Sequence, residues 1–551
     1  MEVVSAGEEV VRPIAKFSPS IWGDFFINHS FPLANDKNAI TLLEQRVEEL
    51  KRTVKELFST NQYITERLLL IDDLQRLGID YRFKQEIDEA LKCINIDNDN
   101  IDDNMYLVAL RFRLLRQQGY HVSSDVFSKF KDDNGSFKQE YAGDIIGLLQ
   151  LYEATGLRTN EDSILDEALD FARYHMERMI TSDIAKGVLA DRIRHALEMP
   201  FHRSRKRLGA RYYMSIYEKD EARNDILLEL AKLDFTLLQR LYQDEIKTFT
   251  MWYNQELGPK KLSFSRDRAV ENYFWALGIM HFEPELATGR LLLAKLLAYV
   301  LVWDDMYDAY GTFEELRLFT DVIERWDLEN VDHLPEYMRV CLSSYSNFMR
   351  EVEDELIKNE RDQLKPYVAE MMKYIIDGFI QEAKWLNEGY IPTMEEYLAN
   401  GLKTGGQTTL NGFSLLFMSE DKVTKDTLEW VLSMPNILKA STLIGRLLND
   451  IKTTKLEHER MHLASSMQIY MNEAGVTEAM AIAKLNRMVA DFWKDINKEL
   501  LDALPFQKDF NTLTLNFART LEVLYKHEDA FTHGSIQREQ IDLMLVWPIQ
   551  N

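Results

Sequence analysis

Apolar residues recur along the chain with the spacing of one face of a helix. Between about Thr41 and Phe58 they fall three and four residues apart, which predicts one amphipathic helix carrying Leu43, Val47, Leu50, Val54 and Leu57. The segments NDILLELAKLDFTLLQRLY and LLLAKLLAYVLVW follow the same spacing with a higher apolar content. Alternating runs typical of strands are rare, and we find no fixed-period repeat. The pattern therefore predicts an all-α protein.

The composition favours the same fold class and more than one domain. The chain has only 23 glycines and 12 prolines in 551 residues, so helix-interrupting residues are scarcer than in an average chain. This length is enough for two or three domains of roughly 100–200 residues each. The polar stretch YEKDEARND, Tyr217 to Asp225, separates two helical patterns. We place the domain boundary there, with units of residues 1–222 and 223–551.

Charge and cysteine content argue against several classes of function. With 65 basic and 90 acidic side chains the formal charge is −25, which repels the phosphates of nucleic acids. Cys93 and Cys341 are not spaced as a metal knuckle and fit a reducing compartment. The first residues, MEVVSAGEEVVRP, do not resemble a targeting peptide, and the longest apolar run is too short to cross a bilayer. We expect a soluble cytoplasmic monomer that neither binds nucleic acid nor spans a membrane.

Three carboxylates follow one of the most apolar stretches. In LVWDDMYDAYGT, Asp304 and Asp308 lie four residues apart and share a helix face, with Asp305 beside them. Such a group repels itself unless a cation neutralises it. Carboxylate oxygens suit Mg²⁺, which usually bridges a protein to substrate phosphates. The motif alone fits a hard-cation site and a solvated helix end equally well.

A second stretch, GRLLNDIKTTKLEHER, favours the metal site. Asn449, Thr453 and Glu457 recur at steps of four residues and form one oxygen-bearing stripe, with its ends about 12 Å apart at Cα. The long glutamate side chain leans toward the helix N-terminus and can share an ion with the other two. Guanidinium groups stay charged and suit bidentate phosphate binding. The arginines near these motifs or shortly before them are Arg266, Arg268, Arg446 and Arg460.

Seven further segments are weak signals singly but specific in their order: RPIAKFSPSIWGD, LQRLGIDYRF, RFRLLRQQGYHVSSDVF, LLELAKLDF, RDRAVENYFWALG, DAYGTFEEL and YKHEDAFTH. With them, the chain resembles a plant class I terpene synthase of the sesquiterpene type over nearly all of its length. The resemblance implies two helical domains. The first would be an α-barrel-like domain without catalytic duty, whose N-terminal segment caps the active site. The second would be the class I terpenoid synthase helical bundle that holds the active site.

The resemblance also implies the reaction and its residues. Farnesyl diphosphate would be ionised, and the carbocation cyclised to a sesquiterpene with release of diphosphate. The two oxygen-bearing motifs would bind Mg²⁺, three ions in number and replaceable by Mn²⁺, and the four arginines would bind the diphosphate. A carbocation requires a cavity that excludes water and presents aromatic faces. The residues implied for catalysis are Arg266, Arg268, Trp275, Tyr525, Asp529 and Phe531, whereas we interpret Met306 and Tyr307 as core residues.

Two departures from the family pattern concern the product. Phe531 stands where the family usually has tyrosine, so a proton transfer by that hydroxyl is in question. Gly405 and Gly406 in KTGGQT replace hydroxyl-bearing or bulkier residues, and we expect them to break a helix and expose carbonyl groups. Val11 precedes Arg12, so the tandem arginines of plastidial monoterpene synthases are missing. A cytosolic monoterpene synthase that uses geranyl diphosphate stays the alternative.

Three other interpretations remain open at this stage. NIDDN, Asn100 to Asn104, approaches the acid motif of class II cyclases, but it begins with Asn and fits a solvated loop. His458, Glu459 and His462 spell the H-E-x-x-H site of zinc metalloproteases, although no recognised third ligand follows. The last alternative is a non-catalytic helical scaffold, which the intact metal motifs disfavour.

Overall fold

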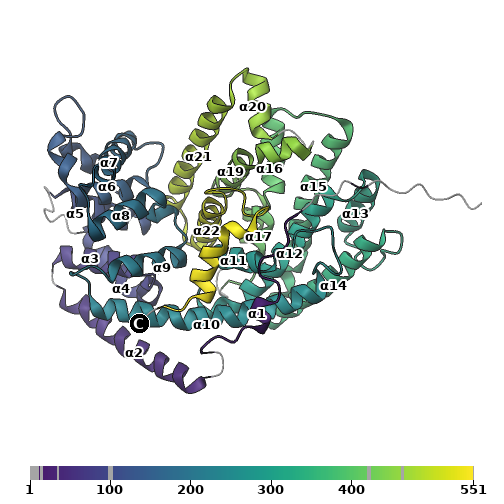
Figure 1. The fold of residues 1–551 in the computed structure, drawn as a ribbon, viewed down its shortest axis with the longest axis horizontal. Helices are drawn as coiled ribbons and strands as arrows, with labels where there is room; N and C mark the ends of the chain where they lie inside the picture. The colour runs from purple at the N-terminus through teal and green to yellow at the C-terminus, as the bar shows by residue number, and fades with distance from the viewer. Residues whose placement is uncertain are drawn as a thin grey trace, which may run out of the picture.

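The computed structural model describes residues 12, 17–33, 36–61, 63–96, 104–418, 423–460 and 465–549, without the side chains of 96, 454–460 and 505. These residues fold into helices joined by turns and short loops (Figure 1). Within the described ranges the only β-type pairing is the isolated bridge between Lys131 and Phe137. The predicted all-α class is confirmed.

The described part of the N-terminal half contains nine α-helices and two separate regions of core. Its helices are α1 (Phe25–Asn28), α2 (Lys37–Thr60), α3 (Ile64–Arg76), α4 (Lys84–Ile96), α5 (Met105–Gln117), α6 (Ile145–Thr155), α7 (Ser163–Thr181), α8 (Gly187–Glu198) and α9 (Lys206–Tyr217). Helices α5 to α8 enclose a small apolar core of their own. The apolar residues of α2, α3, α4 and α9 instead belong to the large core that continues into the C-terminal half.

Helix α2 is the amphipathic helix predicted from residues 41–58, and it is longer at both ends. The Asp36 side chain accepts a hydrogen bond from the backbone N–H of Ala39 at 2.9 Å, so the helix starts earlier than its first apolar residue. Val47, Leu50 and Val54 are buried, as the stripe requires. The pattern identified the helix, and the cap sets its beginning.

Helix α10 (Asp225–Glu256) connects the two halves and runs beneath both in Figure 1. Its N-cap, Asn224, accepts hydrogen bonds from the backbone N–H groups of Ile226 and Leu227. The predicted polar stretch thus lies between the end of α9 and the start of α10. Because α10 packs on helices of both halves, the domain boundary at residue 222 stays a prediction.

The C-terminal half is a bundle of thirteen described α-helices. They are α11 (Ala269–Ile279), α12 (Ala287–Ala309), α13 (Phe313–Arg325), α14 (Glu336–Lys358), α15 (Lys365–Glu388), α16 (Met394–Thr404), α17 (Gln407–Leu415), α18 (Lys425–Leu432), α19 (Asn436–Arg460), α20 (Ser466–Ala474), α21 (Glu478–Leu501), α22 (Lys508–Leu524) and α23 (Arg538–Ile541). The predicted break at KTGGQT is confirmed, since α16 ends at Thr404 and α17 begins at Gln407, directly after Gly406, whose φ is +70°.

Helix α12 is longer than its apolar run suggested. Together with the 3₁₀ turn before it, it spans Pro284–Ala309, 26 residues that are long and apolar enough to cross a membrane by length and composition alone. The expectation that no segment reaches this length is therefore corrected. In its most apolar window, 72% of the residues are buried inside the protein, as in the core helix of a soluble protein.

The N-terminal segment crosses over to the C-terminal half. Arg12 forms a bidentate ion pair with Glu315, with both nitrogen–oxygen distances at 2.7 Å. Its guanidinium also lies over the rings of Tyr310 and Tyr337, 4.8 and 5.0 Å from their centroids. Glu315 is at the same time part of the capping box that starts α13. A single arginine thus fixes this segment to a helix start 303 residues later in the sequence.

Candidate active site

A cavity of about 250 Å³ opens among the C-terminal helices, from α12 and α16 to α19 and α22. Apolar side chains form much of its wall, including Leu297, Val300, Leu301, Phe379, Leu410, Phe517, Leu521 and Leu524. Asp304, Asp305, Asp308, Asn449 and Thr453 line the same cavity. The structure therefore brings the two predicted oxygen-bearing motifs to one site. Glu457 and Arg460 are on α19, but their side chains are outside the described part of the chain.

Two of the three aspartates are already paired with Arg266. Asp305 is almost fully buried, and it accepts hydrogen bonds from Ser265 Oγ at 2.8 Å and from the backbone N–H of Arg266 at 2.7 Å. The Arg266 guanidinium forms ion pairs with Asp305 at 2.8 Å and with Asp304 at 2.5 Å. Burial raises the pKa of Asp305, and Arg266 opposes that rise. Arg266 thus acts as an internal counterion for the aspartate motif.

The third aspartate, Asp308, forms no ion pair with an arginine within the described residues. Asp308 is exposed to the open cavity. The pKa of Asp308 is raised well above the usual carboxyl value. The main cause is desolvation by the surrounding protein, and repulsion from Asp304 and Glu382 adds to it. No group of three His, Cys, Asp or Glu side chains in the described ranges is arranged to hold a metal ion. The predicted three-carboxylate cluster is therefore divided, because Asp305 turns toward Arg266.

The opposite side of the cavity mouth is formed by α19. Thr453 Oγ1 donates a hydrogen bond to the backbone carbonyl of Asn449 at 3.1 Å. One turn earlier, Arg446 donates to Thr404 Oγ1 at 2.6 Å and lies 4.0 Å from Glu382. The Thr404 hydroxyl itself donates to Glu382 at 2.9 Å. Sequence analysis missed Thr404 and Glu382, because neither belongs to a motif with a recognisable spacing.

Three aromatic rings close the cavity beside the segment that follows α22. The Phe531 ring centroid lies 4.1 Å from that of Trp275 and 6.2 Å from that of Tyr525, and all three line the cavity. Asp529, also a lining residue, accepts hydrogen bonds from the Phe531 backbone N–H at 2.9 Å and from Thr532 Oγ1 at 2.6 Å. These four residues lie together, as the sequence predicted.

Met306 and Tyr307 are core residues. Both are buried and neither lines the cavity, and the Tyr307 hydroxyl is hydrogen-bonded to Thr320 at 2.7 Å. The core interpretation of these two side chains is confirmed.

Arg268 differs from Arg266 in what it contacts. Its guanidinium donates to the backbone carbonyls of Phe531 at 3.0 Å, Thr532 at 2.7 Å and Ser18 at 3.1 Å. It is 1% exposed and does not line the cavity. In this structure Arg268 fastens the segment after α22 and the N-terminal segment to each other, so its predicted diphosphate contact stays a prediction.

The N-terminal segment also reaches the cavity directly. Phe17 is a lining residue, and the guanidinium of Arg266 lies 5.1 Å from the centroid of its ring. The sequence resemblance predicted a cap formed by this segment, and among its described residues Phe17 lines the cavity. No motif distinguishes this phenylalanine in the sequence.

Comparisons with known proteins identify one protein family over nearly the whole chain. Residues 21–197 match the model of the terpene synthase N-terminal domain, and residues 255–495 match that of the terpene synthase family metal-binding domain. The chain is 42% identical over 545 residues to (−)-germacrene D synthase of Vitis vinifera, which covers 98% of this chain and 96% of the relative. It is 41% identical over 548 residues to a sesquiterpene synthase of Santalum spicatum, with the same coverage.

A solved structure gives the same result. Isoprene synthase from grey poplar leaves, in complex with three Mg²⁺ ions and dimethylallyl-S-thiolodiphosphate, superposes with a TM-score of 0.87 at 33% identity. The superposition covers 92% of this chain and 98% of that one.

The chain therefore belongs to the terpene synthase family. It is an enzyme of the lyase class that acts on a prenyl diphosphate, and its metal-binding domain implies dependence on a divalent metal. The HERMH stretch falls inside the matched metal-binding domain, and His462 lies outside the described residues. Membership of the family replaces the metalloprotease and scaffold interpretations.

Proposed function

We propose that the chain is a Mg²⁺-dependent sesquiterpene synthase that ionises farnesyl diphosphate, cyclises the carbocation and releases diphosphate. One observation carries the proposal. The oxygen-bearing motifs and two arginines line the same cavity, and its interior is apolar and aromatic. Relatives named (−)-germacrene D synthase and sesquiterpene synthase, at 42% and 41% identity over nearly the whole chain, support farnesyl diphosphate as the substrate.

The donor set fits Mg²⁺. Every described candidate ligand offers oxygen, from Asp304, Asp305, Asp308, Asn449 and Thr453, and oxygen donors select hard cations. With Glu457 they would hold three Mg²⁺ ions, for which Mn²⁺ can substitute; the isoprene synthase complex also contains three Mg²⁺ ions. When bound, the metal supplies positive charge that stabilises the leaving diphosphate. Mg²⁺ is usually bound by only one or two carboxylates, and substrate phosphates and water supply its other ligands. The divided aspartate cluster fits such a site.

The residues of this chain bind and shield the substrate. Arg266 and Arg446 line the cavity mouth and would contact diphosphate oxygens, and the resemblance implies the same role for Arg268 and Arg460. Asp529 fixes the local conformation of the aromatic segment through its two hydrogen bonds. Trp275, Tyr525 and Phe531 would present ring faces to the carbocation and exclude water from it.

The remaining properties follow from composition and chemistry. A formal charge of −25 disfavours nucleic acid as a partner. Helix α12 is mostly buried and serves as a core element, so we propose a protein without a membrane span. We further propose a monomer that acts in the cytoplasm, where the precursor diphosphate would reach an open cavity mouth.

One experiment tests the assignment and its substrate. Purified protein is incubated with geranyl, farnesyl or geranylgeranyl diphosphate plus Mg²⁺, and volatile products are analysed by gas chromatography and mass spectrometry. We expect sesquiterpenes from farnesyl diphosphate, and loss of turnover with EDTA that Mg²⁺ restores. Turnover of geranyl diphosphate alone would assign the chain as a monoterpene synthase. Absence of turnover with all three substrates would contradict the proposed function.

A further inference from the structure

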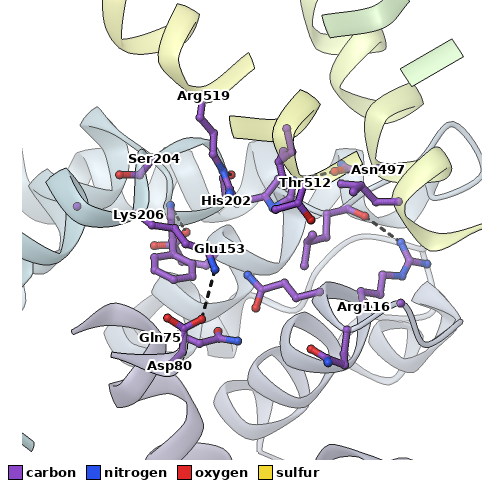
Figure 2. Close-up of a pocket in the computed structure, with 18 of the residues that line it drawn as sticks. Gln75, Asp80, Arg116, Glu153, His202, Ser204, Lys206, Asn497, Thr512 and Arg519 are labelled. Carbon is purple, nitrogen blue, oxygen red and sulfur yellow. Dashed lines mark hydrogen bonds and ion pairs between the residues drawn. The ribbon is translucent and has the colours of Figure 1, made fainter. Parts of the chain in front are cut away.

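A second cavity lies between the N-terminal helices and helices α21 and α22, and Figure 2 shows its walls. Its volume of about 330 Å³ is within the range of small-molecule sites, about 300–1,000 Å³. It shares no lining residue with the catalytic cavity. In Figure 2, Arg519, Thr512 and Asn497 come from the C-terminal helices, opposite Gln75, Asp80 and Glu153. This interdomain cavity is therefore a separate space with its own chemistry.

Most charged groups around the interdomain cavity are neutralised by neighbours. Arg116 is paired with Asp162 and also donates to backbone carbonyls. Arg76 forms ion pairs with Asp72 at 2.8 Å and with Glu153 at 3.5 Å. The second Glu153 oxygen accepts a hydrogen bond from the Phe201 backbone N–H. These pairs leave little negative charge free on the wall.

The other carboxylate on the wall is also compensated. Asp80 lies 3.3 Å from the ammonium of Lys206. Burial lowers the pKa of Arg519 to about 10, and the negative charge of Asp80 opposes that shift. His195 and His202 do not add positive charge at neutral pH, because burial lowers the pKa of each ring. Two cations, Arg519 and Lys508, are left without an ion-pair partner in the described residues.

Arg519 is the unusual member of the wall. It is 6% exposed, and burying an unpaired guanidinium is costly. Its Nε donates to the His202 carbonyl at 2.7 Å and its Nη1 to Asn516 Oδ1 at 3.3 Å. Within the described residues its second terminal nitrogen has no hydrogen-bond partner. The guanidinium is thus held in place by neutral acceptors and forms no ion pair within the described residues.

The positive groups are aligned along one face of α22. Lys508, Thr512 and Arg519 are spaced by four and seven residues and all line the interdomain cavity, with Leu515 between them. Beside this stripe part of the wall is apolar and is formed by Leu157, Phe201, Leu500, Leu501, Ala503 and Leu515. A ligand that satisfies both parts must combine an anionic head with an apolar body.

We propose that the interdomain cavity binds a small organic anion, with a carboxylate or phosphate head on Arg519 and Lys508 and an apolar body against the leucines of α21 and α22. The head would receive hydrogen bonds from the free terminal nitrogen of Arg519 and from the Lys508 ammonium. Since its walls come from both halves of the chain, a bound ligand would also link them and stabilise the folded state. This site is independent of the catalytic cavity and of the proposed reaction.

Calorimetric titration of the full-length protein in EDTA-containing buffer tests the proposal. Phenyl phosphate and phenylacetate serve as probes with the two kinds of head, and benzyl alcohol is the uncharged control. We expect one site per chain for at least one anionic probe, none for benzyl alcohol, and a rise in melting temperature with the bound probe. The probe that binds more tightly shows whether the site prefers a phosphate or a carboxylate head.

Variants assign the site. Lys508→Glu changes an exposed residue and should weaken binding about tenfold or more, and Arg519→Gln should abolish it. Arg487→Gln, on the exposed face of α21, is the matched control and should bind as the parent does. Unchanged binding in both Lys508→Glu and Arg519→Gln would overturn the proposal. So would loss of binding in Arg446→Gln, which would locate the probe in the catalytic cavity, or no binding of either anion at concentrations on the order of 10 mM.

Discussion

One helix separates the catalytic cavity from the interdomain cavity. The ion pairs at the catalytic cavity can exchange partners, whereas those at the interdomain cavity are fixed. Helix α22 presents Phe517, Leu521 and Leu524 to the catalytic cavity and Lys508, Thr512 and Arg519 to the interdomain cavity. At the catalytic mouth, Arg266 neutralises two aspartates at a position where an incoming metal and diphosphate can replace it. Across α22, Arg116 is tied to Asp162 and to backbone carbonyls that nothing in the reaction replaces.

The ion pairs of Arg266 are therefore expected to serve catalysis, and that of Arg116 to serve the stability of the fold. An ion pair that can exchange partners costs little to open, whereas a buried pair reinforced by main-chain hydrogen bonds is costly to break. We therefore expect substitutions at the catalytic mouth to lower activity in a folded protein. Substitutions at the interdomain pairs should lower stability first. The following variants test that separation.

Asp304→Ala should have the largest effect. Asp304 lines the cavity mouth and pairs with Arg266, and a lost metal ligand should cost several kcal/mol, with each factor of ten in rate equal to about 1.4 kcal/mol. We expect kcat/KM to fall by several orders of magnitude with an unchanged melting temperature. Asp102→Ala and Asp103→Ala, in a stretch outside the described residues, are the controls and should stay active. Active Asp304→Ala with inactive controls would remove the class I assignment.

Asp162→Ala should have the opposite signature. It leaves Arg116 buried without its carboxylate, which costs about 3–5 kcal/mol for a buried pair. Chemical denaturation should show that loss, while kcat per folded molecule stays close to that of the parent. A stable but inactive variant would contradict the separation of the two cavities.

The same aspartate predicts a dependence of stability on pH. Burial disfavours the charged carboxylate, but hydrogen bonds from Arg116 and from the Thr159 backbone N–H prevail and lower the pKa of Asp162 to about 2 from the ordinary 3.8. A carboxyl whose pKa is lowered on folding contributes stability above its unfolded pKa and loses it as the pH falls toward the folded one. Between about pH 4 and 2, the parent should therefore lose more stability than Asp162→Ala does, as measured by denaturant titration.

The two arginines of the RDR sequence should differ in effect. Arg266→Gln removes a cation from the cavity mouth, and the loss of one charge-stabilising group typically costs about 10²–10³ in kcat. Arg268→Gln instead removes hydrogen bonds to the segment after α22 and to Ser18, so it should first increase the protease sensitivity of those segments. Steady-state kinetics and limited proteolysis together check both. Equal kinetic losses without a change in proteolysis would mean that Arg268 also binds diphosphate.

Phe531→Tyr should change the products more than the rate. The ring lies against Trp275 in the cavity, while ionisation depends on the aspartate and Asn/Thr/Glu motifs. A hydroxyl at this position can exchange a proton with a late carbocation and redirect the final deprotonation. Gas chromatography beside total turnover measures both effects, and Phe506→Tyr at an exposed position is the control. An unchanged product profile in the active variant would remove Phe531 from the reacting part of the cavity.

Gln407→Leu should have the smallest effect on stability. Gln407 is 1% exposed, and neither amide atom has a hydrogen-bond partner in the described residues. Replacing an unsatisfied buried amide by an apolar side chain of similar size is close to neutral or stabilising, by about 1 kcal/mol. Thermal denaturation should show an equal or higher melting temperature. A lower one would indicate that the amide has a partner within the cavity.

The sequence predicted the elements whose signals are local. Periodicity identified helix α2, and four-residue steps identified the oxygen-bearing residues that line the cavity. The different partners of Arg266 and Arg268 could not be predicted, because both flank Asp267 and only the fold decides which one faces the carboxylates. Glu382, Thr404 and the interdomain cavity depend on contacts between distant helices, for which the sequence carries no spacing signal.

The ion pair between Arg12 and Glu315 has a consequence for folding during synthesis on the ribosome. The two partners are 303 residues apart, so at about 5–20 residues per second the arginine is made roughly 15–60 s before its carboxylate exists. During that interval the first segment has no docking site on the C-terminal helices. It can close over the cavity only after α13 has emerged and formed its capping box. A segment that is synthesised before the C-terminal helices can thus take its final place only after α13 has formed.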